Sequence, residues 1–518
     1  MVCLVRARRA AVALAPALLA VGAWAAFLAD RAPGTDAALR GFPLDDAWIH
    51  MVYARSLVTQ GGFNYNDGVP ETGMTSPLWV VVLAVVRLLT GGSIEAVVIG
   101  AKVASLAFGV AGVVALRRLA LALGAGRGAA FLAACLAALD PSLTFSRAAG
   151  MEVPLFVFLV IAALLAAVRG RPIAAGVAAG LSVVARPEGV VIFPVVFALL
   201  LRREVRARPG AWRRLALATV AAIAPAAAYS LFCLAATGFP LPNTFYAKFH
   251  AANPLSLSTL AFGWGEYVRE NLPYFTLEAG IVLATVGAAW LVRRSGLVGL
   301  APLATGILLF VSVLSTRAYS PGHYYYWERW LIPAFPFLIL GIASGVGALW
   351  AGLGGLRASL LAKAGTASNS IRAVLAAAVV ALVVWPMPSA LRARADLFAW
   401  NCQNIEEMNV VLGRWVDANV PRDAVVAVND AGALRYFGRR ATVDLIGLND
   451  HKILRRDASE GFRTLEQRGV SHFVIFPSWF PGIERLLPLT QVHEVRSPHY
   501  TICEGPQDQM VVYRWERR

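Results

Sequence analysis

Residues 1–30, "MVCLVRARRAAVALAPALLAVGAWAAFLAD", combine a basic start with about twenty consecutive apolar residues. A helix of that length crosses the hydrocarbon core of a bilayer. A cleaved secretory signal is the alternative, but its apolar region is typically shorter. We therefore expect a first membrane-spanning helix over residues 10–29.

The rest of the chain continues this apolar pattern. It has 518 residues, of which 58% are hydrophobic and only 15% are charged, and its mean hydropathy is +0.62. Soluble domains have a lower apolar fraction. The sequence therefore predicts a polytopic α-helical membrane protein with about 11 transmembrane helices, each near the length that a bilayer requires. The predicted spans cover residues 10–29, 94–116, 119–139, 151–168, 172–186, 187–201, 215–236, 275–292, 297–315, 331–353 and 373–388.

The net charge of +16 raises the question of a nucleic-acid partner, and the positions of the basic residues answer it. They gather in the short gaps between apolar runs, as at Arg117 and Arg118 or at Arg202 and Arg203, and these gaps account for the whole positive excess. Basic residues mark the cytoplasmic loops of membrane proteins, so no nucleic-acid partner is expected. This topology puts residues 30–93, 140–150, 237–274, 316–330 and 389–518 outside the cytoplasm.

Two segments interrupt the regular pattern of spans. Residues 77–90, "PLWVVVLAVVRLLT", are apolar but short for a span, and counting them as one would invert the topology downstream. We predict an interfacial or re-entrant helix there. In "ARPEG", residues 185–189, Pro187 disfavours helical geometry at Arg186, so a kink or a tight external turn is expected.

The composition changes after Pro386 and Pro388, and residues 390–518 are polar. Their patterns predict a helix at 405–420, a strand, turn and helix over 423–438, and strands at 441–448 and 471–479. We therefore divide the chain into a transmembrane domain, residues 1–389, and a C-terminal extracytoplasmic α/β domain, residues 390–518. The second domain is large enough for a core of its own.

Cysteines and aspartates of the C-terminal domain are candidates for further roles. Cys402 and Cys503 both lie in this domain, and a disulfide between them is a candidate because an oxidising compartment would permit it. Asp430, Asp444 and Asp450 are either ligands or turn and cap residues, and we favour the second interpretation.

Two adjacent carboxylates head a predicted helix in the first external loop, residues 30–93. In "GFPLDDAWIHMVYARSL", residues 41–57, His50 and Tyr53 follow Asp46 by four and seven residues, which puts them on one helix face. An aspartate at a helix start is a common cap. Capping explains one of Asp45 and Asp46 but not both.

Other polar residues lie on the same predicted side of the membrane. Each has an ordinary explanation, such as snorkelling for a lysine or an aromatic belt for the tyrosines. Together they suit a ligand with a lipid tail, an anionic headgroup and a polar reacting part. They are Glu152 in "GMEVPLF" (150–156), Arg186 and Glu188 in "ARPEG", Asn243, Tyr246, Lys248 and His250 in "GFPLPNTFYAKFH" (238–250), and His323, Tyr324, Glu328 and Arg329 in "RAYSPGHYYYWERW" (317–330).

The histidines and cysteines show no metal-ligand spacing, and the chain has no phosphate-binding P-loop and no GxSxG motif. We therefore expect no metal and no other cofactor.

Residues 44–79, "LDDAWIHMVYARSLVTQGGFNYNDGVPETGMTSPLW", resemble the first external loop of bacterial GT-C membrane glycosyltransferases. The subgroup most similar includes the mycobacterial terminal arabinofuranosyltransferase. Further matching pieces follow in the family's order: "GMEVPLF", "ARPEG", "GFPLPNTFYAKF", "RWLIPAFP" (329–336) and "NDAGALRYFGRRATVDLIGLND" (429–450). His50 departs from the arabinosyl enzymes, so the resemblance does not identify the sugar.

The resemblance implies an inverting transfer of a sugar from a polyprenyl-phosphate donor. The acceptor would be a glycan, lipid or protein of the cell envelope, on the outer, periplasmic side of the bacterial cytoplasmic membrane. One carboxylate of the first external loop would be the general base. We lean to Asp45, because Asp46 is better placed to orient His50.

The same resemblance implies roles for the other outward residues. Lys248 and Arg329 would contact the phosphate, Arg186 with Glu188 would form a structural or donor-site pair, and Asn243, Tyr246 and His323 would lie on the donor side. His50, Tyr53, Glu152, His250 and Tyr324 would line the substrate cavity.

Three other functions remain open from the sequence. A lipid or sugar transporter of the flippase kind would also have many spans, although it would typically show an internal repeat. An O-antigen polymerase or ligase would use a diphosphate-linked donor. In the third, the C-terminal domain would be the functional part and the membrane region only an anchor. About 11 spans are far more than an anchor needs.

Overall fold

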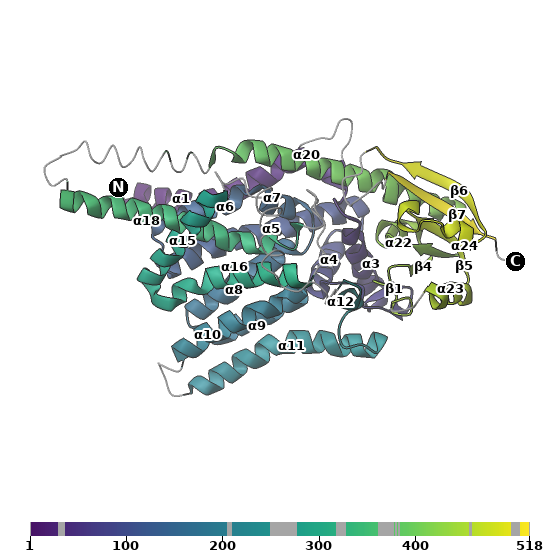
Figure 1. Ribbon diagram of the computed structural model, residues 1–518, viewed down its shortest axis with the longest axis horizontal. Coiled ribbons are helices and arrows are strands. Elements are labelled where there is room, and N and C mark those ends of the chain that lie inside the picture. The colour runs from purple at the N-terminus through teal and green to yellow at the C-terminus, as the bar shows by residue number, and fades with distance from the viewer. Residues whose placement is uncertain are drawn as a thin grey trace.

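The structure is a computed structural model. It describes residues 2–29, 37–204, 210–248, 277–316, 328–360, 378, 381, 384–454, 458–498 and 508–516. Figure 1 shows long helices lying alongside one another, with a β-sheet at one end of the molecule. The helices of the bundle are α1 (Val2–Ala29), α5 (Ile94–Ala122), α6 (Arg127–Leu139), α7 (Pro141–Ala148), α8 (Val153–Val168), α9 (Pro172–Ala185), α10 (Phe193–Glu204), α11 (Ala211–Thr237), α15 (Leu277–Ser295), α16 (Ala301–Thr316) and α18 (Phe335–Leu360).

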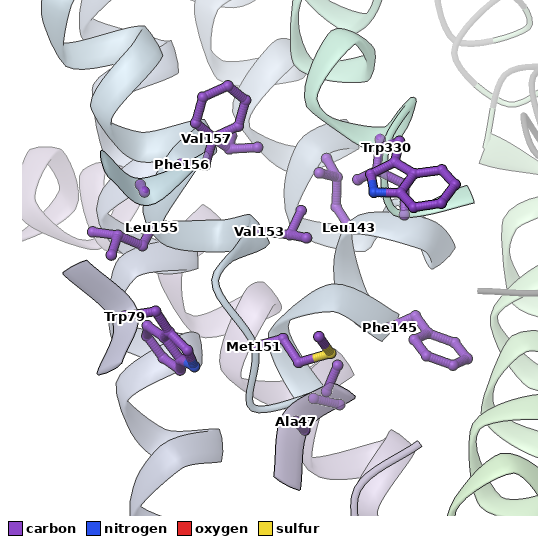
Figure 2. Packing of buried hydrophobic residues seen from close by; sticks show 14 of the residues in the cluster. Ala47, Trp79, Leu143, Phe145, Met151, Val153, Leu155, Phe156, Val157 and Trp330 are labelled. Carbon is purple, nitrogen blue, oxygen red and sulfur yellow. The ribbon is translucent and has the colours of Figure 1, made fainter. Parts of the chain in front are cut away.

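Small residues let these helices approach closely, as is usual in membrane bundles. A Cβ on Gly180 of α9 would overlap the carbonyl of Ala222 in α11. A Cβ on Gly345 of α18 would likewise overlap the carbonyl of Leu283 in α15. Larger side chains fill the centre of the molecule, and Figure 2 shows part of that core, where residues of α3, α4, α7, α8 and the segment before α18 gather.

Four helical stretches of the described residues are long and apolar enough to cross a membrane: Ile94–Ala122, Ala211–Thr237, Ala279–Ser315 and Ile332–Gly352. The pair Arg127–Leu139 and Pro141–Ala148, bent by 55°, makes a fifth if it counts as one span. A helical protein with several apolar helices is thereby confirmed. The number of about 11 spans stays a prediction, and the last predicted span, 373–388, lies mostly outside the described residues.

The boundary predicted between the second and third spans is wrong. We expected a break near residue 117, but α5 continues through Arg117 and Arg118 to Ala122. Arginine is a good helix former, so the charges by themselves do not end the helix. The chain turns at Gly124 and Gly126, whose φ angles of 78° and 90° favour glycine.

The break predicted at "ARPEG" is confirmed. Helix α9 ends at Ala185, and Arg186 is extended, with φ −157° and ψ 136°. A 3₁₀ turn, η1 (Pro187–Ile192), then leads into α10. The residue before a proline avoids helical geometry, and the extended Arg186 is its direct consequence.

The helix α4 (Pro77–Leu89) occupies the short apolar segment predicted as interfacial or re-entrant. Its 13 residues span about 20 Å, less than the ~30 Å of a hydrocarbon core. It packs against α5 and against α3 (Asp45–Gln60). Its place in a membrane stays a prediction.

The remaining elements of the first external loop and of residues 237–248 are short. They are α2 (Ala37–Arg40), the antiparallel strands β1 (Asn64–Asn66) and β2 (Val69–Pro70), and α12 (Asn243–Lys248). Strand β1 and helix α12 lie with α3 and α4 between the bundle and the C-terminal sheet (Figure 1), whereas α2 packs against α1 and α5. The 3₁₀ turns η3 (Gly296–Leu300) and η4 (Ile332–Ala334) precede α16 and α18.

The C-terminal region has the strand, turn and helix elements that the sequence predicts. Helix α20 (Met387–Ile405) runs along the bundle towards the sheet (Figure 1), and the predicted domain boundary at residue 389 falls inside it. A π-helical turn, η5 (Glu406–Val410), and α21 (Val411–Asn419) follow. The later elements are β3 (Val425–Val428), α22 (Ala433–Gly438), β4 (Ala441–Asp444), α23 (Ala458–Gln467), β5 (Val470–Ile475), η6 (Pro477–Trp479), α24 (Ile483–Leu486), β6 (Leu489–Arg496) and β7 (Gln509–Trp515).

The five strands form one mixed sheet in the order β4-β3-β5-β7-β6. Strand β3 pairs in parallel with β4 and β5, and β7 pairs antiparallel with β5 and β6. Alternate residues face opposite sides of a strand. Ala427 therefore joins a small core within this region, whereas Val426 and Val428 join the large core that includes the helical bundle. The sheet is thus packed directly onto the rest of the molecule.

The predicted disulfide is not present in the structure. Cys402 is a free, fully buried thiol of α20, with its Sγ 3.8 Å from the carbonyl oxygen of Gly41. Cys503 lies outside the described residues. Burial of Cys402 between α20 and the first external loop accounts for its position without a disulfide.

Candidate functional site

Helix α3 positions the two aspartates of the first external loop. It begins at Asp45, directly after the extended residue Leu44, and ends where Gly61 takes a left-handed conformation. Most of the helix is buried, including Trp48 and Tyr53, so the packing around it fixes the rotation of α3. That rotation decides which way each aspartate points.

A cavity of about 290 Å³ opens beside α3. Six of the residues predicted from the sequence line it, and they come from four segments that are far apart in the chain. Its lining residues are Asp46, Ile49, His50, Gly73, Thr75, Met151, Glu152, Arg186, Pro187, Glu188, Val190, Val191, Thr244, Phe245, Ser312, Arg329, Trp330 and Leu448.

One ion pair at the cavity joins Asp46 to Arg329. The Arg329 guanidinium donates to Asp46 Oδ2 at 2.5 Å. Only 4% of the Arg329 side chain is exposed, against 24% of the Asp46 side chain. A charge-assisted contact with so buried a cation fixes the position of the carboxylate. The sequence predicted a phosphate contact for Arg329, and the structure adds this carboxylate to its surroundings.

A second ion-pair group lies at the start of η1. Arg186 contacts Glu152 Oε1 at 2.8 Å and Glu188 Oε1 at 3.5 Å. The pairing with Glu188 was predicted, whereas the shorter contact with Glu152, 34 residues away, was not. The other oxygen of Glu152, Oε2, is buried and has no hydrogen-bond partner among the described residues. Because a buried oxygen without a partner costs free energy, it is suited to accept from a ligand hydroxyl.

Asp45 has a different environment from Asp46. The sequence analysis favoured Asp45 as the general base, and the contacts in the structure favour Asp46 instead. Its carboxylate accepts from the backbone N–H groups of Gly432 at 2.7 Å and Ala433 at 2.8 Å. These groups lie at the start of α22, so Asp45 fastens α3 to the C-terminal region. Asp45 is buried and is absent from the cavity lining, whereas Asp46 lines it.

Burial raises the pKa of Asp45 to about 6, and the nearby Asp46 acts in the same direction, while the two backbone N–H groups oppose the rise. The folded protein therefore binds more protons than the unfolded chain between about pH 4 and pH 6. Its free energy of unfolding falls as pH rises through that window. Burial and the charge of Asp45 likewise raise the pKa of Asp430.

We expect Asp45→Asn to flatten this pH dependence. The amide cannot ionise, so the variant keeps the stability that the wild-type protein loses, up to about 3 kcal/mol for a shift of this size. Thermal unfolding of detergent-solubilised protein at pH 4.5 and pH 7 measures the effect. Asp396→Asn, at an exposed position of α20, is the control. Parallel pH profiles for wild type and Asp45→Asn would contradict the prediction.

The other predicted residues are distributed as follows. Tyr53 is buried away from the cavity, and its hydroxyl donates to Asn449 Oδ1 at 3.1 Å. Tyr246 packs against Phe239 and Phe245 instead of lining the cavity. Asn243 lies directly beside the cavity residue Thr244. Lys248 is the last residue of α12, and the structure does not describe its side chain; His250, His323 and Tyr324 lie outside the described residues.

Several cavity residues were missed by the sequence analysis. Thr244 and Phe245 lie within the quoted motif "GFPLPNTFYAKFH" and could have been chosen by their position in it. Leu448 comes from the C-terminal region, and nothing in its local sequence indicates that it reaches this cavity. Glu328, which the sequence analysis noted, instead forms a buried pair with Arg394 of α20 at 2.7 Å.

Asp444 and Asp450 of the C-terminal region stabilise turns, as we favoured, whereas Asp430 accepts from the side chain of Asn409 at 2.8 Å. Asp444 accepts from the backbone N–H groups of Ile446 and Asn449. Asp450 accepts from the backbone N–H of Lys452 and pairs with Arg468. Among the described residues no group of three or more His, Cys, Asp or Glu side chains is arranged to hold a metal ion.

Comparison with known proteins places the chain by its fold. Residues 403–513 match a family model described as a domain of unknown function, DUF8728. No curated protein sequence matches the chain. The solved structure of ArnT from Cupriavidus metallidurans in the apo state is similar over 96% of this chain and 97% of ArnT, with a TM-score of 0.60 and 14% identity. ArnT bound to undecaprenyl phosphate is similar over the same shares, with a TM-score of 0.58 and 14% identity.

Two further glycosyltransferase structures are similar. Archaeal oligosaccharyltransferase AglB from Archaeoglobus fulgidus, in complex with an inhibitory peptide and a dolichol-phosphate, matches over 91% of this chain and 69% of AglB, with a TM-score of 0.59 and 12% identity. Arabinofuranosyltransferase AftD from Mycobacteria matches over 98% of this chain but only 41% of AftD, with a TM-score of 0.50 and 18% identity. The resemblance to GT-C proteins is thereby confirmed at the level of the fold.

Proposed function

We propose that this protein transfers a sugar from a polyprenyl-phosphate donor to a hydroxyl group of a cell-envelope glycan, lipid or protein, with inversion at the anomeric carbon. The proposal rests on one observation: the Asp46–Arg329 and Arg186–Glu152 pairs line the same cavity, in a chain with the GT-C fold. Two structures of that fold hold undecaprenyl phosphate and dolichol-phosphate, which supports a lipid-phosphate substrate here.

Asp46 is the general base in this proposal. It removes the proton of the acceptor hydroxyl as the oxygen attacks the anomeric carbon. The bond from that carbon to the phosphate oxygen breaks, and its electron pair leaves with the lipid phosphate. A single displacement of this kind inverts the configuration. Arg329 and Lys248 stabilise the charge that develops on the phosphate.

The second ion-pair group binds the sugar. Arg186 holds Glu152 in place, and Glu152 Oε2 accepts from a sugar hydroxyl, with Glu188 beside it. Carboxylates are good acceptors for hydroxyl groups and repel other anions. This end of the cavity therefore suits the sugar better than the phosphate.

The reaction takes place on the outer side of the bacterial cytoplasmic membrane. The positive charges between the apolar runs support this orientation. Leu448 of the C-terminal region lines the same cavity as Asp46, which supports a common, extracytoplasmic side for both.

Transfer from a radiolabelled polyprenyl-phosphate sugar in proteoliposomes tests the proposal. A panel of pentose and hexose donors, each offered as the monophosphate and the diphosphate, should give product from one monophosphate. Product from the diphosphate alone would indicate a polymerase or ligase, and movement of lipid across the bilayer without transfer would indicate a transporter. Mass spectrometry of envelope glycans in a deletion strain would then identify the sugar and the acceptor.

We also propose that the transfer needs no divalent metal ion, because each of the three carboxylates that line the cavity, Asp46, Glu152 and Glu188, is paired with an arginine. Dialysis against EDTA is therefore expected to leave the transfer rate unchanged within about twofold, well below the loss that removal of a catalytic metal causes. The assay is repeated after adding Mg²⁺, Mn²⁺ or Zn²⁺. Loss of activity with EDTA and recovery with one of these ions would contradict this part of the proposal.

A further inference from the structure

A buried carboxylate that the proposed mechanism does not use, Glu71, joins three distant segments of the chain. Its side chain is only 5% exposed. Glu71 Oε2 accepts from Asn243 Nδ2 of α12 at 2.9 Å. Glu71 Oε1 lies 2.7 Å from His451 Nδ1, in the segment after β4. Since an ionised carboxylate only accepts, Nδ1 of His451 carries the proton in this contact.

The neighbours of these three residues form one side of the cavity. Gly73, Thr244 and Leu448 all line it, and each is at most three residues from a member of the Glu71 contacts. The segments touch again beside the carboxylate. The backbone N–H of Asn243 donates to Thr72 Oγ1 at 3.1 Å, and a Cβ on Gly73 would overlap the Asn449 side chain and the Leu448 carbonyl. The contacts between these three segments thus fix this side of the cavity and leave little free space between the segments.

A polar atom in this wall has no partner within the part of the chain that the structure describes. Thr244 is 4% exposed and lines the cavity, and its Oγ1 is buried without a hydrogen bond. A buried hydroxyl without a partner costs about 1–3 kcal/mol, and a ligand oxygen in the cavity would remove that cost. Position 248 follows by four residues, which puts the two positions on one face of a helix.

We propose that Glu71 is a positioning residue, which holds α12 through Asn243 so that the Thr244 hydroxyl donates to the phosphate of the bound lipid. The identity of that ligand rests on the proposed function. The unpartnered Thr244 hydroxyl by itself indicates a hydrogen-bonding ligand group in the cavity, next to Thr244.

The test reverses one hydrogen bond without changing its shape. In Asn243→Asp, the new carboxylate faces the carboxylate of Glu71, and neither group can donate. Adding Glu71→Gln restores a donor and an acceptor with the direction reversed, because the amide NH₂ donates to the new carboxylate while the amide oxygen still accepts from His451. The double variant should therefore recover what the single variant loses, which a general loss of packing would not do.

Binding of undecaprenyl phosphate to the full-length protein in detergent is the first measurement. We expect the Kd to rise about tenfold in Asn243→Asp, which equals about 1.4 kcal/mol, and to return to within about threefold of wild type in Glu71→Gln/Asn243→Asp. Asn419→Asp, at an exposed position of α21, is the control for the same chemical change. Thermal unfolding verifies that the variants compared are folded.

Thr244→Val removes the hydroxyl and keeps the shape of the side chain. It should raise the Kd as Asn243→Asp does, and the two changes combined should raise it little beyond either alone, because they act through one contact. In the transfer assay both variants should raise KM for the donor more than they lower kcat. Equal effects on binding of undecaprenyl phosphate and of the sugar-linked lipid identify the phosphate as the group contacted, whereas an effect confined to the sugar-linked lipid overturns that assignment.

The possible failures are distinguishable. If wild type binds undecaprenyl phosphate and Asn243→Asp or Thr244→Val binds it equally well, the positioning role is wrong and the proposed function stands. The positioning role is also wrong if Glu71→Gln does not restore binding to Asn243→Asp. If folded wild type binds no polyprenyl phosphate, the proposed function fails and this inference fails with it.

Discussion

Replacing Asp46 with Asn is expected to lower the rate of sugar transfer by about 10³-fold, within the range that removal of a general base causes. The amide keeps the size of the side chain and can still accept from Arg329, but it cannot take the proton of an acceptor hydroxyl. Asp46 lines the cavity and lies 2.5 Å from Arg329, which would hold the amide in the same place. The loss of rate would therefore come from the loss of the base and not from a change in geometry. The measurement is kcat for transfer from the labelled donor.

The neighbouring aspartate provides a matched comparison. Asp45→Asn changes the same chemical group one residue away, where the carboxylate contacts the backbone of Gly432 and Ala433 instead of the cavity. We expect it to keep kcat within about tenfold of wild type, because it disturbs a structural contact and not the base. A full loss in Asp45→Asn with full activity in Asp46→Asn would make Asp45 the general base. Full activity in both variants would show that neither aspartate is the general base.

Replacing Arg186 with Met is expected to destabilise the protein by about 3–5 kcal/mol and to abolish donor binding. Arg186 lies between two carboxylates whose side chains are only 6% and 10% exposed, Glu152 and Glu188. Without the guanidinium, Glu152 remains buried without the cation that it contacts at 2.8 Å, which is the costly way to break a buried ion pair. Thermal unfolding measures the loss of stability. Binding of sugar-linked undecaprenyl phosphate measures the loss of donor binding.

A second substitution separates the charge from the packing. Arg186→Met/Glu152→Gln removes the charge of Glu152 and should recover part of the lost stability, while donor binding stays weak because Glu152 is the proposed sugar contact. Arg171→Met, at an exposed position in the loop before α9, is the control and should change neither property. Unaltered stability in Arg186→Met would show that the buried pair contributes nothing.

The fold was largely predictable because its signals are local. Long apolar runs indicated the bundle, Pro187 indicated the extended Arg186, and residues 423–438 gave the strand, turn and helix now seen as β3 and α22. The helix boundary at Arg117 failed for an equally local reason. Charge indicated a loop there, whereas backbone geometry allowed the helix to continue to the glycines after it.

The site was predictable as a set of residues and not as a set of contacts. The sequence indicated Asp46, Glu152, Arg186 and Arg329, and all four line one cavity. It did not indicate that Arg186 pairs with Glu152, because helices α8 and α9 lie between them in the chain and their packing decides the distance. Glu71 was missed altogether, since its partners at 243 and 451 are brought together only by the folded chain.

The sequence by itself determined a helical membrane protein with two carboxylates at the start of one helix, beside other polar residues of the predicted outer side. Only the tertiary structure decided which carboxylate faces the cavity. Consecutive residues of an α-helix point about 100° apart, so Asp45 and Asp46 cannot both face the same group. The amides of Gly432 and Ala433, from a region almost 390 positions later, hold Asp45, and the rotation of α3 that this contact fixes leaves Asp46 beside Arg329.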